Sequence, residues 1–352
     1  MRIAVLYSLP TKRAIASPYK ATDEDTKDSA EEVAEALAQK DAESFLVPLS
    51  EDGIDAIGAI QADCIFNLIE WDGFDLPLGR QAYEQLEALH VPFTGSRLSV
   101  FDRTSDKVDM KKMMDDAGIP TPRWQVFTTG KESIRPDFQY PVIVKLALEH
   151  CSIGLPSDAV VRDERALLPI LQERITVFQQ PVIVEEYVSG REFQVTIVAK
   201  RDGPVALPTA EITFTHQGND DAFLTYNSRW NEEHPDYSLS NVLLANLTPA
   251  LKNKLQDISL AAWKTFGFCD YARLDIRTRK DSGLTRNQGE KIYVLEANAN
   301  PGLGDSDEYG MTVSYKAAGM TFADFIWEIV QSSLKRFLRK NTVARFVARL
   351  DL

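Results

Sequence analysis

The chain has 352 residues, of which 44% are hydrophobic, and its formal net charge at pH 7 is −13. That length allows more than one buried core, so we expect two or three domains. The acidic balance disfavours general binding of nucleic acid, and no apolar run is long enough to span a bilayer. Three widely spaced cysteines disfavour a disulfide framework and favour a cytoplasmic protein.

The N-terminal third alternates strand and helix patterns. Residues 3–7 form a short apolar run followed by polar sequence, which predicts a first strand rather than a signal peptide. Further strands are predicted at 45–48 and 64–69, and helices at 30–39 and 80–89. This alternation predicts a parallel, doubly wound sheet.

Two polar segments interrupt the regular pattern. Residues 10–27 are polar and irregular, and we expect a mobile loop at the edge of the first sheet. Residues 219–237 are rich in polar and aromatic side chains and are expected to form a long loop. A loop of that length in a compact domain is usually functional or disordered.

The middle of the chain carries a second set of elements. A helix is predicted over 106–117, ending at Gly118, and another over 251–266. Short apolar strands are predicted at 141–145, 181–185 and 193–199.

The C-terminal segment is predicted to contain two helices. Thr321 with Asp324 makes a capping box for the first, which carries an apolar stripe. Residues 341–342 shift the phase of the stripe, so a separate short amphipathic helix is predicted over 343–350. The basic tail, residues 335–349, leaves membrane association as an alternative, but packing on its own domain or on a second copy is favoured.

Two apolar strands carry carboxylates near the end of the chain. In 294–302, Glu296 and Asn298 are two residues apart, so strand geometry puts both on one face. An upstream strand repeats this spacing with Arg273 and Asp275. Carboxylate and carboxamide oxygens suit Mg²⁺, which usually also binds substrate phosphates. The pattern predicts an ATP-using enzyme, with a salt bridge from Arg273 to a carboxylate as the structural alternative.

Two further motifs suit a nucleotide. Lys145 ends a predicted strand and precedes a turn of small residues at 149–154, an arrangement that can clamp phosphate. A solvated lysine at a strand end is the alternative. Residues 185–188, followed by Glu192, can pair with an adenine edge and bind ribose hydroxyls, although they also suit a charged turn.

The order of these motifs resembles the ATP-grasp superfamily, and within it the D-alanine–D-alanine ligase group, from residue 3 to about residue 330. The resemblance also includes Phe66-Asn67, residues 92–96, Asp106-Lys107 and residues 117–122. It implies an α/β, ATP-grasp fold in which an N-terminal doubly wound parallel-sheet domain is followed by two α+β subdomains that clasp ATP. The implied domains are 1–103, 104–187 and 188–352.

The resemblance implies roles for individual residues. Contacts to ATP are implied for Lys107, Lys145, Glu185, Glu186, Tyr187, Val188, Glu192 and Leu295. Two Mg²⁺ ions, with Mn²⁺ as an alternative, are implied on Asp275, Glu296 and Asn298. Catalytic roles are implied for Arg273 and the Gly302 backbone at a tetrahedral intermediate, for Ser152 in a phosphate-covering loop, and for Arg229 in a mobile loop.

Several positions depart from the ligase pattern. Residues 9–12 replace a Glu-His-Glu-type turn, Cys151 replaces a substrate-orienting serine, and Arg229 replaces a lysine. The acidic run 303–308 stands where the ligases bind an acceptor carboxylate, which like charge would repel. D-alanine is therefore not the expected substrate. The candidate substrate contacts are Ser306, Asp307 and Cys151.

We expect an ATP-dependent carboxylate–amine ligase that acts through an acyl phosphate. Its substrates would be an amino acid or small carboxylate and an amine, with no nucleic acid or membrane partner, and a homodimer is compatible with the sequence. One alternative is another ATP-grasp reaction, such as carboxylation or simple phosphorylation. A second is a regulatory module that holds ATP without turnover.

Overall fold

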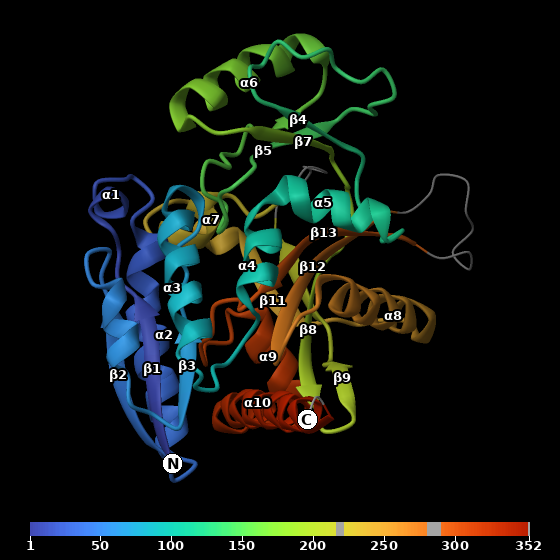
Figure 1. Cartoon of the computed structure of the whole chain (residues 1–352). Coiled ribbons are helices and arrows are strands. Elements are labelled where there is room, and N and C mark those ends of the chain that lie inside the picture. The colour runs from blue at the N-terminus through green and yellow to red at the C-terminus, as the bar shows by residue number, and fades with distance from the viewer. Residues whose placement is uncertain (216–221, 280–289, 351–352) are drawn as a thin grey trace.

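The computed structural model describes residues 1–215, 222–279 and 290–350, and Figure 1 shows how their elements are arranged. Three sheets follow one another along the chain: a parallel sheet of three strands, a sheet of four and a sheet of six. The four-stranded sheet and its helix form the upper lobe in Figure 1, above the other two sheets. The predicted fold class is confirmed.

The N-terminal sheet has strand order β2-β1-β3, with β1 (Arg2–Ser8) between β2 (Glu43–Leu49) and β3 (Cys64–Leu68). Both pairings are parallel. Helix α2 (Ala21–Ala38) packs on one face, while α3 (Leu76–Ala88) packs on the other. Burial on both faces explains why β1 and β3 are apolar at successive positions rather than at alternate ones.

The expected mobile loop at residues 10–27 is wrong. Helix α1 (Lys12–Ile15) begins in this segment, and α2 begins at Ala21, nine residues before the predicted start of the helix. Thr11 caps α1, because its side chain accepts a hydrogen bond from the Ala14 amide at 3.0 Å. The Thr11 hydroxyl also donates to Asp75 at 2.8 Å, so a contact distant in sequence orders this segment.

The four-stranded sheet has order β4-β7-β5-β6 and antiparallel pairings throughout. Its strands are β4 (Trp124–Phe127), β5 (Val142–Leu146), β6 (Val160–Val161) and β7 (Val182–Glu186). Helix α6 (Glu164–Phe178) covers one face and encloses a separate core with it. This core contains Phe127, Val144, Leu171 and Val184.

The six-stranded sheet has order β11-β10-β8-β12-β13, with β9 paired to β8. Its strands are β8 (Glu192–Lys200), β9 (Gly203–Ala206), β10 (Ala210–Phe214), β11 (Ser240–Leu244), β12 (Tyr271–Arg279) and β13 (Lys291–Ala299). Helix α8 (Pro249–Phe266) packs its apolar side onto this sheet. The sheet thereby holds β12 and β13 side by side near the middle of the molecule (Figure 1).

Short elements connect these layers. They are η1 (Ile54–Ala59), η2 (Gly73–Asp75), α4 (Leu98–Ser105), α5 (Lys107–Asp116), α7 (Tyr226–Trp230), η3 (Tyr237–Leu239) and α9 (Gly310–Ala317). Helices α7 and η3 fall in the segment expected to be one long loop, so that expectation is wrong for residues 226–230 and 237; residues 219–221 lie outside the described residues.

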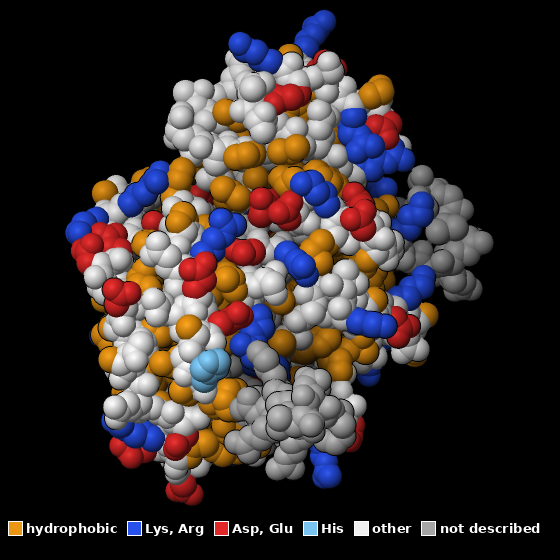
Figure 2. Space-filling view, viewed as in Figure 1, with side chains coloured by type: hydrophobic (Ala, Val, Ile, Leu, Met, Phe, Trp, Pro, Cys, Tyr) orange, Lys and Arg blue, Asp and Glu red, His pale blue; other side chains and the backbone are white. Residues whose placement is uncertain are grey.

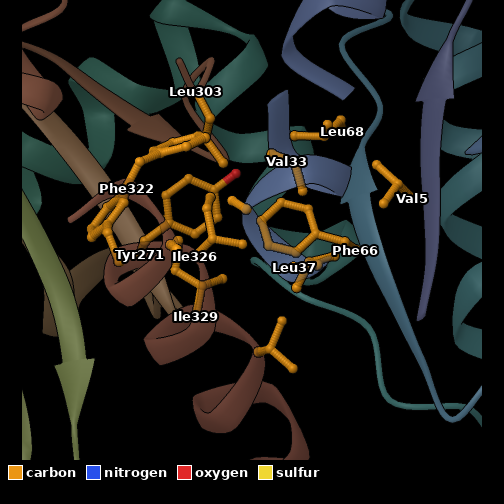
Figure 3. Packing of buried hydrophobic residues seen from close by; sticks show 14 of the residues in the cluster. Val5, Val33, Leu37, Phe66, Leu68, Tyr271, Leu303, Phe322, Ile326 and Ile329 are labelled. Carbon is orange, nitrogen blue, oxygen red and sulfur yellow. The ribbon is translucent and has the colours of Figure 1, made fainter. Parts of the chain in front are cut away.

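The last helix, α10, runs as one element from Phe322 to Leu350, so the predicted break at residues 341–342 is wrong. The predicted capping box at its start is confirmed, because the Thr321 hydroxyl accepts from the Asp324 amide while the Asp324 carboxylate accepts from the Thr321 amide. Figure 3 shows the apolar side of α10 against the N-terminal domain, where Ile326 and Ile329 share a core with Phe66. Among the described residues, no helix combines the length and apolar character needed to cross a membrane.

Candidate active site

All three sheets contribute to a cavity of about 260 Å³. The segment after β3 supplies Glu70 and Asp72, the segments after β5 and β7 supply one side, and β12 and β13 supply the floor. Acidic and basic side chains are interspersed across the middle of the face seen in Figure 2. The cavity brings together sixteen of the predicted site residues: Lys107, Lys145, Cys151, Ser152, Glu185, Glu186, Tyr187, Val188, Glu192, Arg229, Arg273, Asp275, Leu295, Glu296, Asn298 and Gly302.

The floor is built by the register of β12 against β13, in which Arg273 pairs with Asn298 and Asp275 pairs with Glu296. All four side chains therefore lie on one face of the sheet. Arg273 binds Asp275 through two contacts, Nε to Oδ1 at 2.9 Å and Nη2 to Oδ2 at 3.2 Å, and Asn298 Nδ2 donates to Asp275 Oδ2 at 3.1 Å. The salt bridge considered as the structural alternative is thus present, beside the predicted cluster of oxygen donors.

Two bases flank Glu296. Its Oε1 lies 3.0 Å from Lys107 Nζ and 3.1 Å from His150 Nδ1. Burial would raise the pKa of Glu296, but Lys107 and His150 outweigh it and hold the pKa well below its ordinary value. Glu296 is consequently a carboxylate at neutral pH. The Lys107 ammonium also donates to the Glu149 carbonyl, which fixes its place beside Glu296.

The donors on the floor suit Mg²⁺ or Mn²⁺ in type, because two carboxylates and a carboxamide oxygen share one face. Within the described part of the chain, no group of three or more His, Cys, Asp and Glu side chains could hold a metal by itself. A cation bound to Asp275, Glu296 and Asn298 would therefore need further oxygen ligands, such as those of nucleotide phosphates.

Glu185 on β7 forms ion pairs with Lys111 Nζ at 3.2 Å and with Lys145 Nζ on the neighbouring β5 at 3.0 Å. Burial would raise the pKa of Glu185, but the two ammonium groups lower it below its ordinary value. Burial also lowers the pKa of Lys111 to about 8. Glu185 thus holds Lys145 at the wall of the cavity, so the alternative of a freely solvated lysine is wrong.

The segment expected to bind the adenine base and ribose is held by an arginine that sequence reasoning missed. Arg277 Nε and Nη2 donate to Glu192 Oε2 at 2.8 and 2.6 Å. Arg277 Nη1 donates to the Tyr187 hydroxyl at 2.8 Å and the Val188 carbonyl at 3.0 Å. Nη2 also donates to the Ala222 carbonyl at 2.5 Å. One buried guanidinium therefore connects 187–188, Glu192 and the segment that begins at Ala222.

The segment 222–230 is joined to the turn after β5. Ser152 Oγ donates to the Leu224 carbonyl at 2.9 Å, and Trp230 Nε1 donates to the Cys151 carbonyl at 3.0 Å. Cys151 and Ser152 both have left-handed backbone, with φ of 53° and 62°. Burial raises the pKa of the Cys151 thiol to about 12, so this side chain stays neutral. Ser152 thus binds another segment of the chain with its hydroxyl.

The predicted contacts of Ser306 and Asp307 with substrate are not supported by their positions. Neither residue lines the cavity, whereas Tyr309 does. The Lys316 ammonium lies 3.0 Å from Asp307 and 3.2 Å from Asp305. Lys316 of the following helix thus binds two of these carboxylates, and the repulsion of an acceptor carboxylate by the acidic run stays a prediction.

Other cavity residues were missed by the sequence analysis. They are Asp25, Glu70, Asp72, His150, Arg277, Asn300 and Tyr309. A signal existed for Arg277, because it continues the alternation of Arg273 and Asp275 along one strand. The others come from segments that only the tertiary fold brings together.

Comparison with known proteins gives concordant results. The family profile described as D-ala D-ala ligase C-terminus matches residues 113–331. An uncharacterized protein, y4sG, of Sinorhizobium fredii is 30% identical over 257 residues, which cover 72% of this chain and 69% of that protein. A D-alanine–D-alanine ligase of Marinobacter nauticus is 26% identical over 309 residues, which cover 85% and 87%. The crystal structure of a D-alanine–D-alanine ligase from Bacillus anthracis complexed with ATP aligns with a TM-score of 0.71 at 22% identity, over 97% of this chain and 99% of that one.

Proposed function

This chain belongs to the D-alanine–D-alanine ligase family of ATP-grasp proteins, and from that premise we propose that it is an ATP-dependent carboxylate–amine ligase. The substrates proposed are an amino acid or small carboxylate and an amine. The observation that carries the proposal is the cavity floor, where Glu296 and Asp275 lie beside Lys107 and Arg273. Anionic oxygens for a cation and cationic groups for phosphate thus meet in one place.

In the first proposed step, a substrate carboxylate oxygen attacks the γ-phosphorus of ATP, the bond to the bridging oxygen breaks, and ADP leaves. The products are an acyl phosphate and ADP. Lys107, Lys145 and Arg273 would stabilise the negative charge that spreads over the transferring group. Asp275, Glu296 and Asn298 would hold Mg²⁺, which when bound supplies further neutralisation of that charge.

In the second proposed step, a neutral amine attacks the acyl carbon, inorganic phosphate leaves, and the nitrogen loses a proton to give the amide. Arg273 and the Gly302 backbone N–H are proposed to stabilise the tetrahedral oxyanion. The carboxylates of Asp25, Glu70 and Asp72 lie on the N-terminal side of the cavity and would attract a cationic amine before it deprotonates. Arg229 from α7 supplies positive charge at the same end.

The test is ADP release from ATP and Mg²⁺ with amino acids and small carboxylates, added singly and in pairs with amines. We expect ADP release to require both substrates and to match amide formation, measured by mass spectrometry. ADP release with one substrate and no amine would favour phosphorylation or carboxylation. ATP binding by calorimetry without any ADP release would favour the regulatory module.

A lysine variant tests whether ATP binds in this cavity. Lys145→Ala is expected to weaken ATP binding by about tenfold or more, since it removes a charged contact from the cavity wall. The matched control is Lys131→Ala, which alters an exposed lysine on the same subdomain and should leave ATP binding unchanged. Equal affinity in both variants would place the nucleotide elsewhere.

A further inference from the structure

Asn298 near the end of β13 is followed at alternate positions by Asn300 and Gly302, which lie in the turn after the strand. The proposed chemistry uses only Asn298 and Gly302. Asn300 between them has left-handed backbone, with φ of 49°. Asparagine tolerates this conformation better than most residues, and it ends the strand by changing the chain direction. The conformation of Asn300 therefore decides where the next two residues, Pro301 and Gly302, lie.

The Asn300 side chain is held by the N-terminal domain. Its Oδ1 accepts a hydrogen bond from the Ser96 amide at 2.8 Å, and its Nδ2 donates to the Tyr83 hydroxyl. Tyr83 is fully buried, stacks on Phe101 with ring centroids 4.5 Å apart, and accepts a second hydrogen bond from Asn67 at 3.1 Å. The partners of Asn300 are thus themselves fixed.

Gly95 allows the Asn300 side chain to lie close to the backbone of the 92–96 segment. It has φ of 84°, and a Cβ built on it would lie 2.1 Å from Asn300 Oδ1. Its amide donates to Asp270 Oδ2 at 2.8 Å, which ties the same turn to the start of β12. Gly95 and Ser96 of the 92–96 motif therefore meet Asn300 directly, and Asn67 of the Phe66-Asn67 motif reaches it through the Tyr83 hydroxyl.

From this convergence we infer that Asn300 is a positioning residue, through which the N-terminal domain sets the place of the Gly302 backbone in the cavity. The inference rests on the proposed function for its catalytic consequence. Loss of the side chain would leave ATP binding intact, because the contacts of Asn300 lie away from residues 185–192. It would slow the chemical step, because a misplaced donor stabilises the transition state less well.

The variant that tests this is Asn300→Gly, because glycine keeps the left-handed backbone without strain and removes only the side chain. The matched control is Asp41→Gly, another left-handed residue, with φ of 55°, that is exposed and distant from the cavity. The Ser96 and Gly95 amides are the hydrogen-bonded amides at this contact, since they donate to Asn300 Oδ1 and Asp270 Oδ2. Their hydrogen exchange should accelerate about tenfold in Asn300→Gly, as expected for the loss of the two hydrogen bonds of the Asn300 side chain, and should not change in Asp41→Gly.

The kinetic expectation is a fall in kcat of about tenfold with an ATP dissociation constant within about twofold of the native value. Unchanged exchange at Gly95 and Ser96 would overturn the inference, and so would acceleration spread equally over the whole chain. Hydrogen exchange needs no turnover. If the native protein shows no ligase activity, the proposed function fails, while the exchange comparison still decides the role of Asn300.

Two further variants approach the same contact from its partners. Tyr83→Phe removes the hydroxyl and should reproduce part of the effect on exchange, which keeps the inference testable if Asn300→Gly does not fold. Gly95→Ala introduces a Cβ against Asn300 Oδ1 and should lower kcat less in an Asn300→Gly background than in the native one. Equal losses in the two backgrounds would show that Gly95 and Asn300 act independently and would overturn the inference.

Discussion

Glu296 lies beside Lys107 and His150, and we propose that its negative charge is needed for turnover. Because Lys107 and His150 keep it ionised, Glu296→Gln changes the charge without changing the shape. We expect ADP formation to fall about 100-fold or more, the scale on which one lost electrostatic contact to a reacting group is felt. Asp275→Asn should behave alike. The measurement is ADP release over a Mg²⁺ titration, with thermal melting to verify the fold.

A buried carboxylate outside the cavity provides the control for this pair. Glu211 is buried and bound by Arg191 at 2.6 Å, so Glu211→Gln alters an enclosed, paired carboxylate that does not line the cavity. It should lower thermal stability more than it lowers turnover. Near-native ADP formation by Glu296→Gln at saturating Mg²⁺ would contradict the proposed role of this residue.

Arg277 carries a second prediction at this scale. Because it holds one oxygen of Glu192, Arg277→Met should free that carboxylate to move and weaken recognition of the ribose. We expect KM for ATP to rise about tenfold and the preference for ATP over 2′-deoxy-ATP to narrow. Initial rates with the two nucleotides provide the measurement.

Removing one member of a buried ion pair also costs stability, about 3–5 kcal/mol. The double variant Arg277→Met/Glu192→Gln removes both charges and should recover part of the lost thermal stability. It should not recover the nucleotide preference. A preference that is native in both variants would show that the pair serves folding alone.

The sequence predicts the floor of the site better than its walls. Alternation along two strands was enough to place Arg273, Asp275, Glu296 and Asn298 on one face, because strand geometry is local. Arg277 continues the same alternation and could have been predicted. His150 and Asn300 could not, since their contacts depend on segments more than a hundred residues away in the chain.

Helix α10 packs against a domain that lies far from it in the sequence. Its residues Phe325, Ile326, Ile329 and Val330 are fully buried in one core with β1, β3 and α2 (Figure 3). The same core also contains Val198, Tyr271 and Tyr315, so the last helix packs between the first domain and the third, to which the proposed boundaries assign it. Hydrophobic periodicity predicted the helix and its stripe, but it could not predict which sheet the stripe would cover.

We therefore expect Ile329→Ala to destabilise the N-terminal domain together with α10. A buried isoleucine truncated to alanine costs about 2–5 kcal/mol, because apolar burial is lost and a cavity remains. Urea denaturation measures the change. Leu338→Ala on the same helix, where the side chain is 65% exposed, should cost about 0.5 kcal/mol or less. Equal costs would indicate that α10 does not share the N-terminal core.

Two errors of the sequence analysis have local physical causes. Residues 10–27 lack an apolar stripe of their own, and Thr11 and its hydrogen bond to Asp75 supply the order that composition did not reveal. The phase shift at 341–342 was interpreted as a break. A helix can continue through such a shift, because backbone hydrogen bonds do not depend on which side is apolar.

Across the whole molecule, the cavity is enclosed by segments from different layers. The upper lobe has its own core, distinct from those of the other two sheets. Its turn at 151–155 is joined to 222–230 by hydrogen bonds from Ser152, Trp230 and the Tyr226 amide. The Tyr19 and Tyr226 rings pack edge-on with their centroids 4.7 Å apart, so the N-terminal domain also contacts this segment. An acyl phosphate needs such enclosure, because water would hydrolyse it.

Trp230→Phe tests whether these contacts exclude water. Phenylalanine keeps the aromatic ring but cannot donate to the Cys151 carbonyl, so the two segments should separate more often. We expect more ADP formed per amide, about twofold or more for the loss of one hydrogen bond of average strength. Native enzyme should give a ratio near one. The matched control is Trp327→Phe on α10, a partly buried tryptophan remote from the cavity, which should leave the ratio unchanged. An unchanged ratio in Trp230→Phe, with native hydrogen exchange over 151–155 and 222–230, would mean that this contact does not guard the intermediate.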